Sequence, residues 1–67
     1  MDKMKMAQRL KDLRMKTGKS QAEVAKTLDI SLSSYTKYEA GIKVPRDEMK
    51  VKIADFYGQT VQNIFFS

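Results

Sequence analysis

Residues 21–41, QAEVAKTLDISLSSYTKYEAG, carry the signals for two short helices separated by a tight turn. Ser20 and Glu23 form an S-x-x-E capping box just ahead of an apolar repeat, which predicts the start of the first helix. Asp29 tolerates the left-handed turn conformation, and its side chain competes with helix formation. Ser31 follows and is suited to the N-cap of the second helix.

Each of these two helices has one apolar face that can pack inward. Val24 and Leu28 recur at i, i+4 in the first helix, and Tyr35 and Tyr38 recur at i, i+3 in the second. Gly41 can end the second helix in the left-handed conformation. Two helices this short, with almost no room to splay, are typical of a helix-turn-helix.

The same residues resemble the helix-turn-helix of the Cro/phage-repressor (XRE-type) family of DNA-binding transcription regulators. In that family the first helix of the motif begins with glutamine, as at Gln21, and a small residue lies where the two helices touch, as at Ala25. The second helix commonly ends in Tyr-Glu-x-Gly, which residues 38–41 match. The resemblance extends from about Met6 to Phe65, so it covers nearly the whole chain.

The residues before the motif predict one further helix. Met6, Leu10 and Leu13 fall at i, i+4, i+7 on a helix from about Lys3 to Lys16, which forms one apolar stripe. Gly18 is a natural end for that helix.

A fourth and a fifth helix are predicted after the motif. Pro45 is suited to starting a helix, and Gly58 can close it. Its inward stripe consists of Met49, Ile53, Phe56 and Tyr57. Thr60 can cap a short fifth helix. The fold expected is a single all-α domain over residues 1–67, a five-helix repressor-like DNA-binding domain with a helix-turn-helix.

Composition and charge exclude several classes of protein. The chain has 67 residues, no cysteine and no histidine, which excludes disulfides and the usual zinc sites. The formal net charge of +5 is consistent with a polyanionic partner. No run is long or apolar enough to cross a membrane, and the N-terminus lacks the apolar core of a signal peptide. We therefore expect a soluble cytoplasmic protein without metal or other cofactor.

The outward side of the second motif helix is the expected base-reading surface. If that helix enters the major groove of DNA, its outward residues reach base edges. The expected base-reading residues are Leu32, Ser33, Thr36 and Lys37. Lys37 is chemically the best reader, because lysine can donate to O6 and N7 of guanine. Leu32 offers only apolar contact, and packing against the first motif helix is its alternative role.

A second set of residues is expected to hold the DNA backbone. By resemblance, Gln21 matches a phosphate-contacting glutamine, and Lys43 and Arg46 flank the connector after the recognition helix. Ser34 could donate to a phosphate or simply fill the first helical turn. For each basic residue taken alone, the alternative is an ordinary solvated charge.

The resemblance also implies a structural ion pair. The arginine at the position of Arg14 commonly pairs in the family with the glutamate at the position of Glu39. Such a pair would tie the first helix to the end of the recognition helix. The alternative is two unrelated surface charges.

The end of the chain is the expected contact of a homodimer, formed by Val61, Phe65 and Phe66. Phe65 and Phe66 cannot both face inward from adjacent helical positions, so at least one ring is expected near the surface. Because one five-helix module offers few base contacts, we expect a symmetric dimer on a palindromic operator, at least on DNA. The alternative is that the tail caps the core of its own chain.

The function expected is a sequence-specific, double-stranded DNA-binding transcriptional regulator, Cro- or repressor-like and of phage, prophage or mobile-element type. Antitoxins and restriction-modification controllers share this fold and stay open as alternatives. Because the chain ends just after the predicted fold, we expect no ligand-sensing domain and no small-molecule ligand. Regulation would then depend on concentration, on operator layout or on a separate partner protein.

Two other classes of function fit the sequence less well. A catalytic role is not expected, because the sequence contains no nucleophile–histidine pair, P-loop or metal cluster. The other class is a protein-interaction module on the same scaffold, such as a co-activator bridge or antirepressor that does not touch DNA. Binding of that module to duplex DNA would show little salt dependence, whereas a DNA-binding protein would show a steep one.

Overall fold

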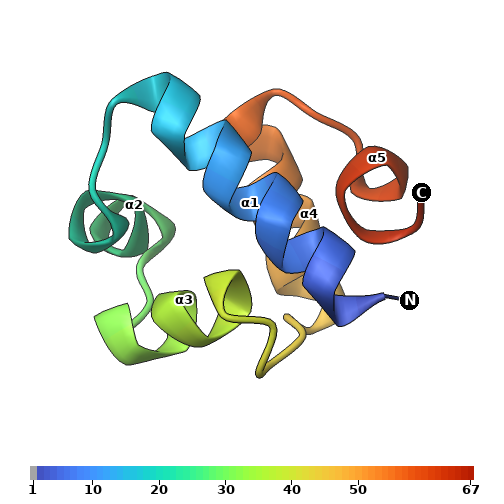
Figure 1. The fold of residues 1–67 in the computed structure, drawn as a ribbon. Helices are drawn as coiled ribbons and strands as arrows, with labels where there is room; N and C mark the ends of the chain where they lie inside the picture. Colours follow the sequence, from blue (N-terminus) through green and yellow to red (C-terminus); the bar gives the residue numbers. More distant parts are fainter. Residues whose placement is uncertain (1) are drawn as a thin grey trace.

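Five helices make up the computed structural model of the protein, which describes residues 2–67 (Figure 1). In chain order they are α1 (Lys3–Thr17), α2 (Gln21–Leu28), α3 (Leu32–Glu39), α4 (Asp47–Tyr57) and α5 (Val61–Phe65). The described residues contain no strand. The expected all-α fold with five helices is therefore confirmed.

The two helices of the motif begin and end at the residues that the sequence indicates. The Ser20 N–H donates to Glu23 Oε1 at 3.0 Å, and the Glu23 N–H donates to Ser20 Oγ at 3.1 Å, which completes the capping box of α2. Asp29 ends α2 with φ at 59°, in the left-handed region. The Ser34 N–H then donates to Ser31 Oγ at 3.0 Å, which caps the start of α3.

The start of α4 differs from the expectation. The helix begins at Asp47, so Pro45 lies two residues before its first turn instead of starting it. Pro45 is buried, and Arg46 occupies the N-cap without a capping hydrogen bond from its side chain. The carboxylates of Asp47 and Glu48 lie in the first turn, where the helix dipole favours negative charge. Charge therefore replaces side-chain capping at this helix end.

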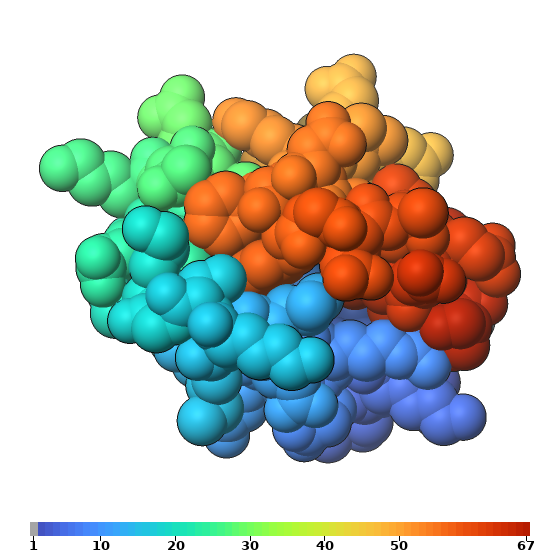
Figure 2. Space-filling view, turned by 90° about the horizontal axis from the view of Figure 1, so that it is seen from above, coloured from blue at the N-terminus to red at the C-terminus, as the bar shows by residue number. Residues whose placement is uncertain are grey.

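One hydrophobic core receives side chains from all five helices. Tyr35 lies at its centre, fully buried on the inward face of α3. The other fully buried large side chains are Met6, Leu10, Val24, Leu28, Ile53, Ile64 and Phe65. The first helix (blue) and the end of the chain (red) lie side by side (Figure 2), and Arg9 Nη1 donates to the Ile64 carbonyl at 3.2 Å. The short α5 is thereby held against α1.

The two adjacent phenylalanines near the chain end face in opposite directions. Phe65 is 2% exposed and belongs to the core, whereas Phe66 is 52% exposed. Lys50 Nζ lies 5.0 Å from the centroid of the Phe66 ring. The expectation that only one ring can face inward is confirmed. Phe65 is buried within its own chain and Val61 packs against that core, so of the three residues expected at a dimer contact Phe66 is the one with a largely exposed ring.

A buried ion pair ties α1 to the end of α3. Arg14 Nε donates to Glu39 Oε2 at 2.7 Å, and Arg14 Nη2 donates to Glu39 Oε1 at 3.1 Å. The Glu39 side chain is 2% exposed and that of Arg14 is 15% exposed. Gln21 Nε2, from the first turn of α2, donates to Glu39 Oε1 at 3.0 Å. Three helices therefore meet at one carboxylate.

The surroundings of Glu39 favour its charged form. Burial on its own raises the pKa of a carboxyl group, but the hydrogen bonds that it accepts, led by that from Arg14, outweigh burial, so the pKa of Glu39 lies below its ordinary value. The hydrogen bond with Glu39 also raises the pKa of Arg14. Both partners of the pair are therefore charged at neutral pH.

Replacing Arg14 with alanine should destabilise the protein, because it leaves the Glu39 carboxylate buried without its main partner. The expected loss in the free energy of unfolding lies toward the lower end of about 3–5 kcal/mol, since Arg14 keeps some contact with water. Urea unfolding of parent and variant measures it. Asp47→Asn is the matched control: it breaks the Lys50–Asp47 pair, whose carboxylate side chain is 99% exposed, and removes one charge from the first turn of α4, so stability should fall by less than about 1 kcal/mol. An Arg14→Ala protein as stable as its parent would contradict the prediction.

Candidate nucleic-acid interface

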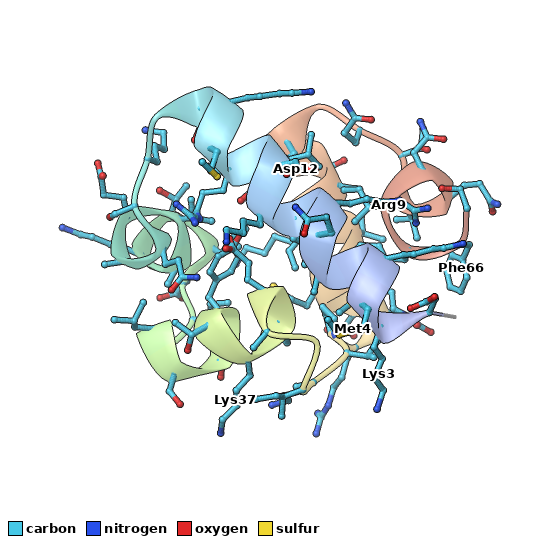
Figure 3. The ribbon with its side chains drawn as sticks, viewed as in Figure 1. Lys3, Met4, Arg9, Asp12, Lys37 and Phe66 are labelled. Carbon is cyan, nitrogen blue, oxygen red and sulfur yellow. The ribbon has the colours of Figure 1, made fainter. Side chains whose placement is uncertain are left out.

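The expected base-reading residues lie on the side of α3 that faces away from the core. Tyr35 and Tyr38 point inward, with their rings in an edge-to-face contact and their centroids 6.3 Å apart. Ser33 and Lys37 are exposed on the opposite side. Lys37 projects away from the fold (Figure 3), and within residues 2–67 its side chain makes no hydrogen bond or ion pair. The ammonium group of Lys37 can therefore donate to an acceptor outside the protein.

Leu32 and Thr36 are placed differently from those two residues. Leu32 is 47% exposed and does not belong to the apolar side chains packed on the core, so its side chain is open to an apolar contact. Thr36 is half-buried, and its hydroxyl donates to backbone carbonyls of its own helix, at 3.0 Å to Leu32 and 2.9 Å to Ser33. The Thr36 hydroxyl is therefore already engaged, and its methyl group is the part left for a ligand.

The residues expected at the DNA backbone lie around both ends of the motif. Lys43 and Arg46 are exposed in the connector between α3 and α4. The Lys43 N–H donates to the Lys37 carbonyl at 3.3 Å, which keeps the connector close to the last turn of α3. Ser34 is half-buried, and its Oγ accepts a hydrogen bond from Ser31 Oγ at 3.0 Å, so its own proton is free to be donated.

Gln21 has a structural role that its position in the sequence did not reveal. One N–H of its amide is engaged with Glu39, and the side chain is half-buried at the start of α2. An amide nitrogen carries two hydrogens, so one donor is still available for a phosphate oxygen. Gln21 therefore connects the buried carboxylate with the surface on which the motif is exposed.

Lys52 also positions the motif, although no sequence pattern indicates this role. Lys52 Nζ, from α4, donates to the carbonyl of Leu28 at 2.6 Å, in the last turn of α2. A cation at this end of a helix complements the helix dipole and satisfies a carbonyl that has no partner within the helix. The bond joins residues far apart in sequence, so no local sequence pattern predicts it. It fixes the motif against α4.

The exposed side of α3 is a convex helix surface. A hollow of about 210 Å³ lies elsewhere, between α1 and α5, with Arg9, Lys16 and Asn63 among its lining residues. In Figure 1, α5 and α3 lie on opposite sides of α1. In the part of the chain that the structure describes, no group of three or more His, Cys, Asp or Glu side chains could hold a metal ion. None of the described helices is long and apolar enough to span a membrane. The convex, exposed side of α3 suits insertion into a groove of a partner.

Comparison with known proteins gives the same motif. A family model described as a helix-turn-helix domain matches residues 5–63. One similar protein is the cryptic phage CTXphi transcriptional repressor RstR of Vibrio cholerae serotype O1 (strain ATCC 39315 / El Tor Inaba N16961), 48% identical over 52 residues. That alignment covers 78% of this chain and 46% of the relative. A second Vibrio cholerae protein of the same name is 32% identical over 56 residues, which are 84% of this chain and 50% of the relative.

The matches cover most of this chain but only part of each relative. The chain spans about half the length of the curated relatives it matches. No solved structure gives a significant match. The family match, however, includes all of α2 and α3 together with the caps and the turn that define them. This chain therefore belongs to the helix-turn-helix domain family.

Proposed function

We propose that this protein is a sequence-specific, double-stranded DNA-binding regulator of transcription of phage type, with α3 as its recognition helix. One observation carries the proposal: the outward side of α3 in a helix-turn-helix chain presents Ser33 and Lys37, and the exposed cations Lys43 and Arg46 follow directly. The two relatives are named as phage transcriptional repressors, which favours repression. The Cro/repressor (XRE-type) subtype and a cytoplasmic location, where bacterial DNA is found, are parts of the same proposal.

The proposed contacts divide into base reading and backbone positioning. With α3 in the major groove, Lys37 donates to O6 and N7 of a guanine, and Ser33 donates to or accepts from a neighbouring base edge. Leu32 and the Thr36 methyl group supply apolar contacts, for example with the methyl group of thymine. On the backbone, phosphate oxygens accept from Gln21, Ser34, Lys43 and Arg46. These contacts set the register of α3 without reading sequence.

We also propose that the protein binds a palindromic operator as a homodimer, at least when it is on DNA. A single recognition helix with four outward residues offers few base contacts, and each is worth about 1–3 kcal/mol of discrimination. A second copy on an adjacent half-site doubles that discrimination. The half-exposed Phe66 ring beside the core is the surface feature that favours a contact between two copies through this end of the chain.

Replacing Lys37 with alanine should weaken binding to the preferred site by about 1–3 kcal/mol and relax preference at one base position, because a bidentate contact to guanine is lost. Sites selected from random duplex DNA by parent and variant measure both effects. An equal loss on every sequence would assign Lys37 to the backbone. A parent protein that selects no sites and binds duplex with little salt dependence would contradict the proposed function and favour a protein-interaction module.

Replacing Lys43 or Arg46 with alanine should lower affinity about equally on all sequences, because a phosphate contact is not sequence-specific. Each change should also reduce the salt dependence, the slope of log K against log salt, by about one unit. Lys16→Ala is the matched control, since Lys16 lines the hollow between α1 and α5 and should keep the parent slope. If Lys43→Ala and Arg46→Ala also keep that slope, these residues do not bind the backbone.

Replacing Phe66 with alanine should abolish cooperative binding to a full palindrome while leaving affinity for an isolated half-site unchanged. The reason is that the ring lies outside the core, so its loss affects contact between copies and not the fold of one copy. Quantitative titration of both duplexes by parent and variant tests this. A variant that still binds the palindrome cooperatively would show that the copies do not meet through Phe66.

A further inference from the structure

Outside the motif, an exposed lysine lies at the start of α1. We propose that Lys3, the first residue of α1, is a further contact to the DNA backbone, so that the interface extends beyond α2, α3 and their connector. The proposal deepens the proposed function and rests on it, because it requires the exposed side of α3 to face a duplex. Neither the helix-turn-helix pattern nor the expected contact residues include this lysine.

The chain leaving α3 passes directly against the first turn of α1. Gly41 has φ at 72°, in the left-handed region that favours glycine. A Cβ atom placed on Gly41 would lie 3.1 Å from Met4 Sδ and 3.3 Å from the Lys3 carbonyl oxygen. A side chain at this position would therefore crowd the start of α1. This close approach places Lys3 beside the C-terminal end of the recognition helix, although the two are distant in sequence.

The charged groups at this junction are disposed toward an external anion. Lys3 and Lys37 project from the same side of the molecule (Figure 3), and Lys43 follows Lys37 in the connector after α3. Lys3 is exposed, and its ammonium group makes no ion pair with any group in residues 2–67. The nearest acid in sequence, Asp2, is turned to the helix backbone, where its Oδ1 accepts from the N–H groups of Met4 at 2.9 Å and Lys5 at 3.2 Å.

Two large apolar side chains are exposed at the same junction. Met4 and Ile42 are each 68% exposed, and both adjoin the contact between Gly41 and the start of α1. A partner that covers exposed apolar side chains gains free energy by removing them from water, and a polyanion bound to Lys3 and Lys43 would cover Met4 and Ile42 as well. The duplex backbone, with phosphates next to apolar sugar edges, is the occupant that matches both features. Lys3 would then bind a phosphate near those bound from the connector.

The test is Lys3→Gln, measured as the salt dependence of binding to random-sequence duplex DNA. Glutamine has nearly the helix propensity of lysine, so the first turn of α1 should be retained. The expected result is a slope smaller than that of the parent by about one unit, with affinity reduced equally on all sequences. The matched control is Lys16→Gln, in the last turn of the same helix and about 20 Å away at 1.5 Å per residue. It removes the same charge and should keep the parent slope. Urea unfolding of both variants checks that the fold is unchanged.

Each other outcome overturns either the contact at Lys3 or the proposed function. If the Lys3→Gln protein keeps the parent slope while the parent binds duplex DNA, the contact at Lys3 is refuted and the proposed function stands. If Lys16→Gln lowers the slope as much as Lys3→Gln, the effect comes from net charge, and the assignment to Lys3 is equally refuted. A parent without salt-dependent binding to duplex DNA refutes the proposed function itself, and the inference with it.

Discussion

The orientation of α3 depends on one buried carboxylate. Glu39 ends α3 and receives hydrogen bonds from Arg14 of α1 and Gln21 of α2, so the three helices share a single polar contact. The carboxylate is almost fully buried, and its charge is acceptable there only because these donors neutralise and orient it. Hydrophobic packing holds the helices together without fixing their rotation closely, whereas directional hydrogen bonds do fix it. The angle at which α3 projects from the fold is therefore set at its C-terminal end.

Other polar contacts between residues far apart in sequence also join one helix to another. Lys52 reaches the last turn of α2, and Arg9 reaches the carbonyl of Ile64 in α5. Both cations satisfy carbonyls at the ends of helices that are too short to be stable alone. The hydroxyls of Tyr35 and Tyr57 add a contact of 2.5 Å between α3 and α4. In a chain without disulfides, such bonds supplement a small core and fix how its helices meet.

How much of this could be read from the sequence depends on whether the cause is local. The capping box at Ser20, the left-handed Asp29 and the cap at Ser31 act within a few residues, and each was predicted. The pairing of Arg14 with Glu39 was expected only through a family resemblance, since their spacing says nothing about their distance. Pro45 satisfies the rule for a first helical residue, but α4 begins two residues later, after an N-cap at Arg46.

The candidate site divides in the same way. The outward positions of Ser33 and Lys37 follow from helical periodicity once the two tyrosines are taken as buried. The engagement of the Thr36 hydroxyl and the second role of Gln21 depend on particular contacts and could not be predicted from spacing. Burial of Phe65 instead of Phe66 also needed the structure, because two adjacent aromatic residues compete for one place in the core.

The separation of outward and inward residues on α3 has a consequence for how such proteins diverge. Leu32, Ser33 and Lys37 contribute nothing to the core, so a mutation at any of them leaves the fold free to form. Glu39, by contrast, can change only together with its donors on two other helices. If α3 reads bases as proposed, single changes at these exposed positions can alter operator preference without loss of the fold. Two related regulators in one cell could then come to bind different operators after a few mutations at exposed residues of α3.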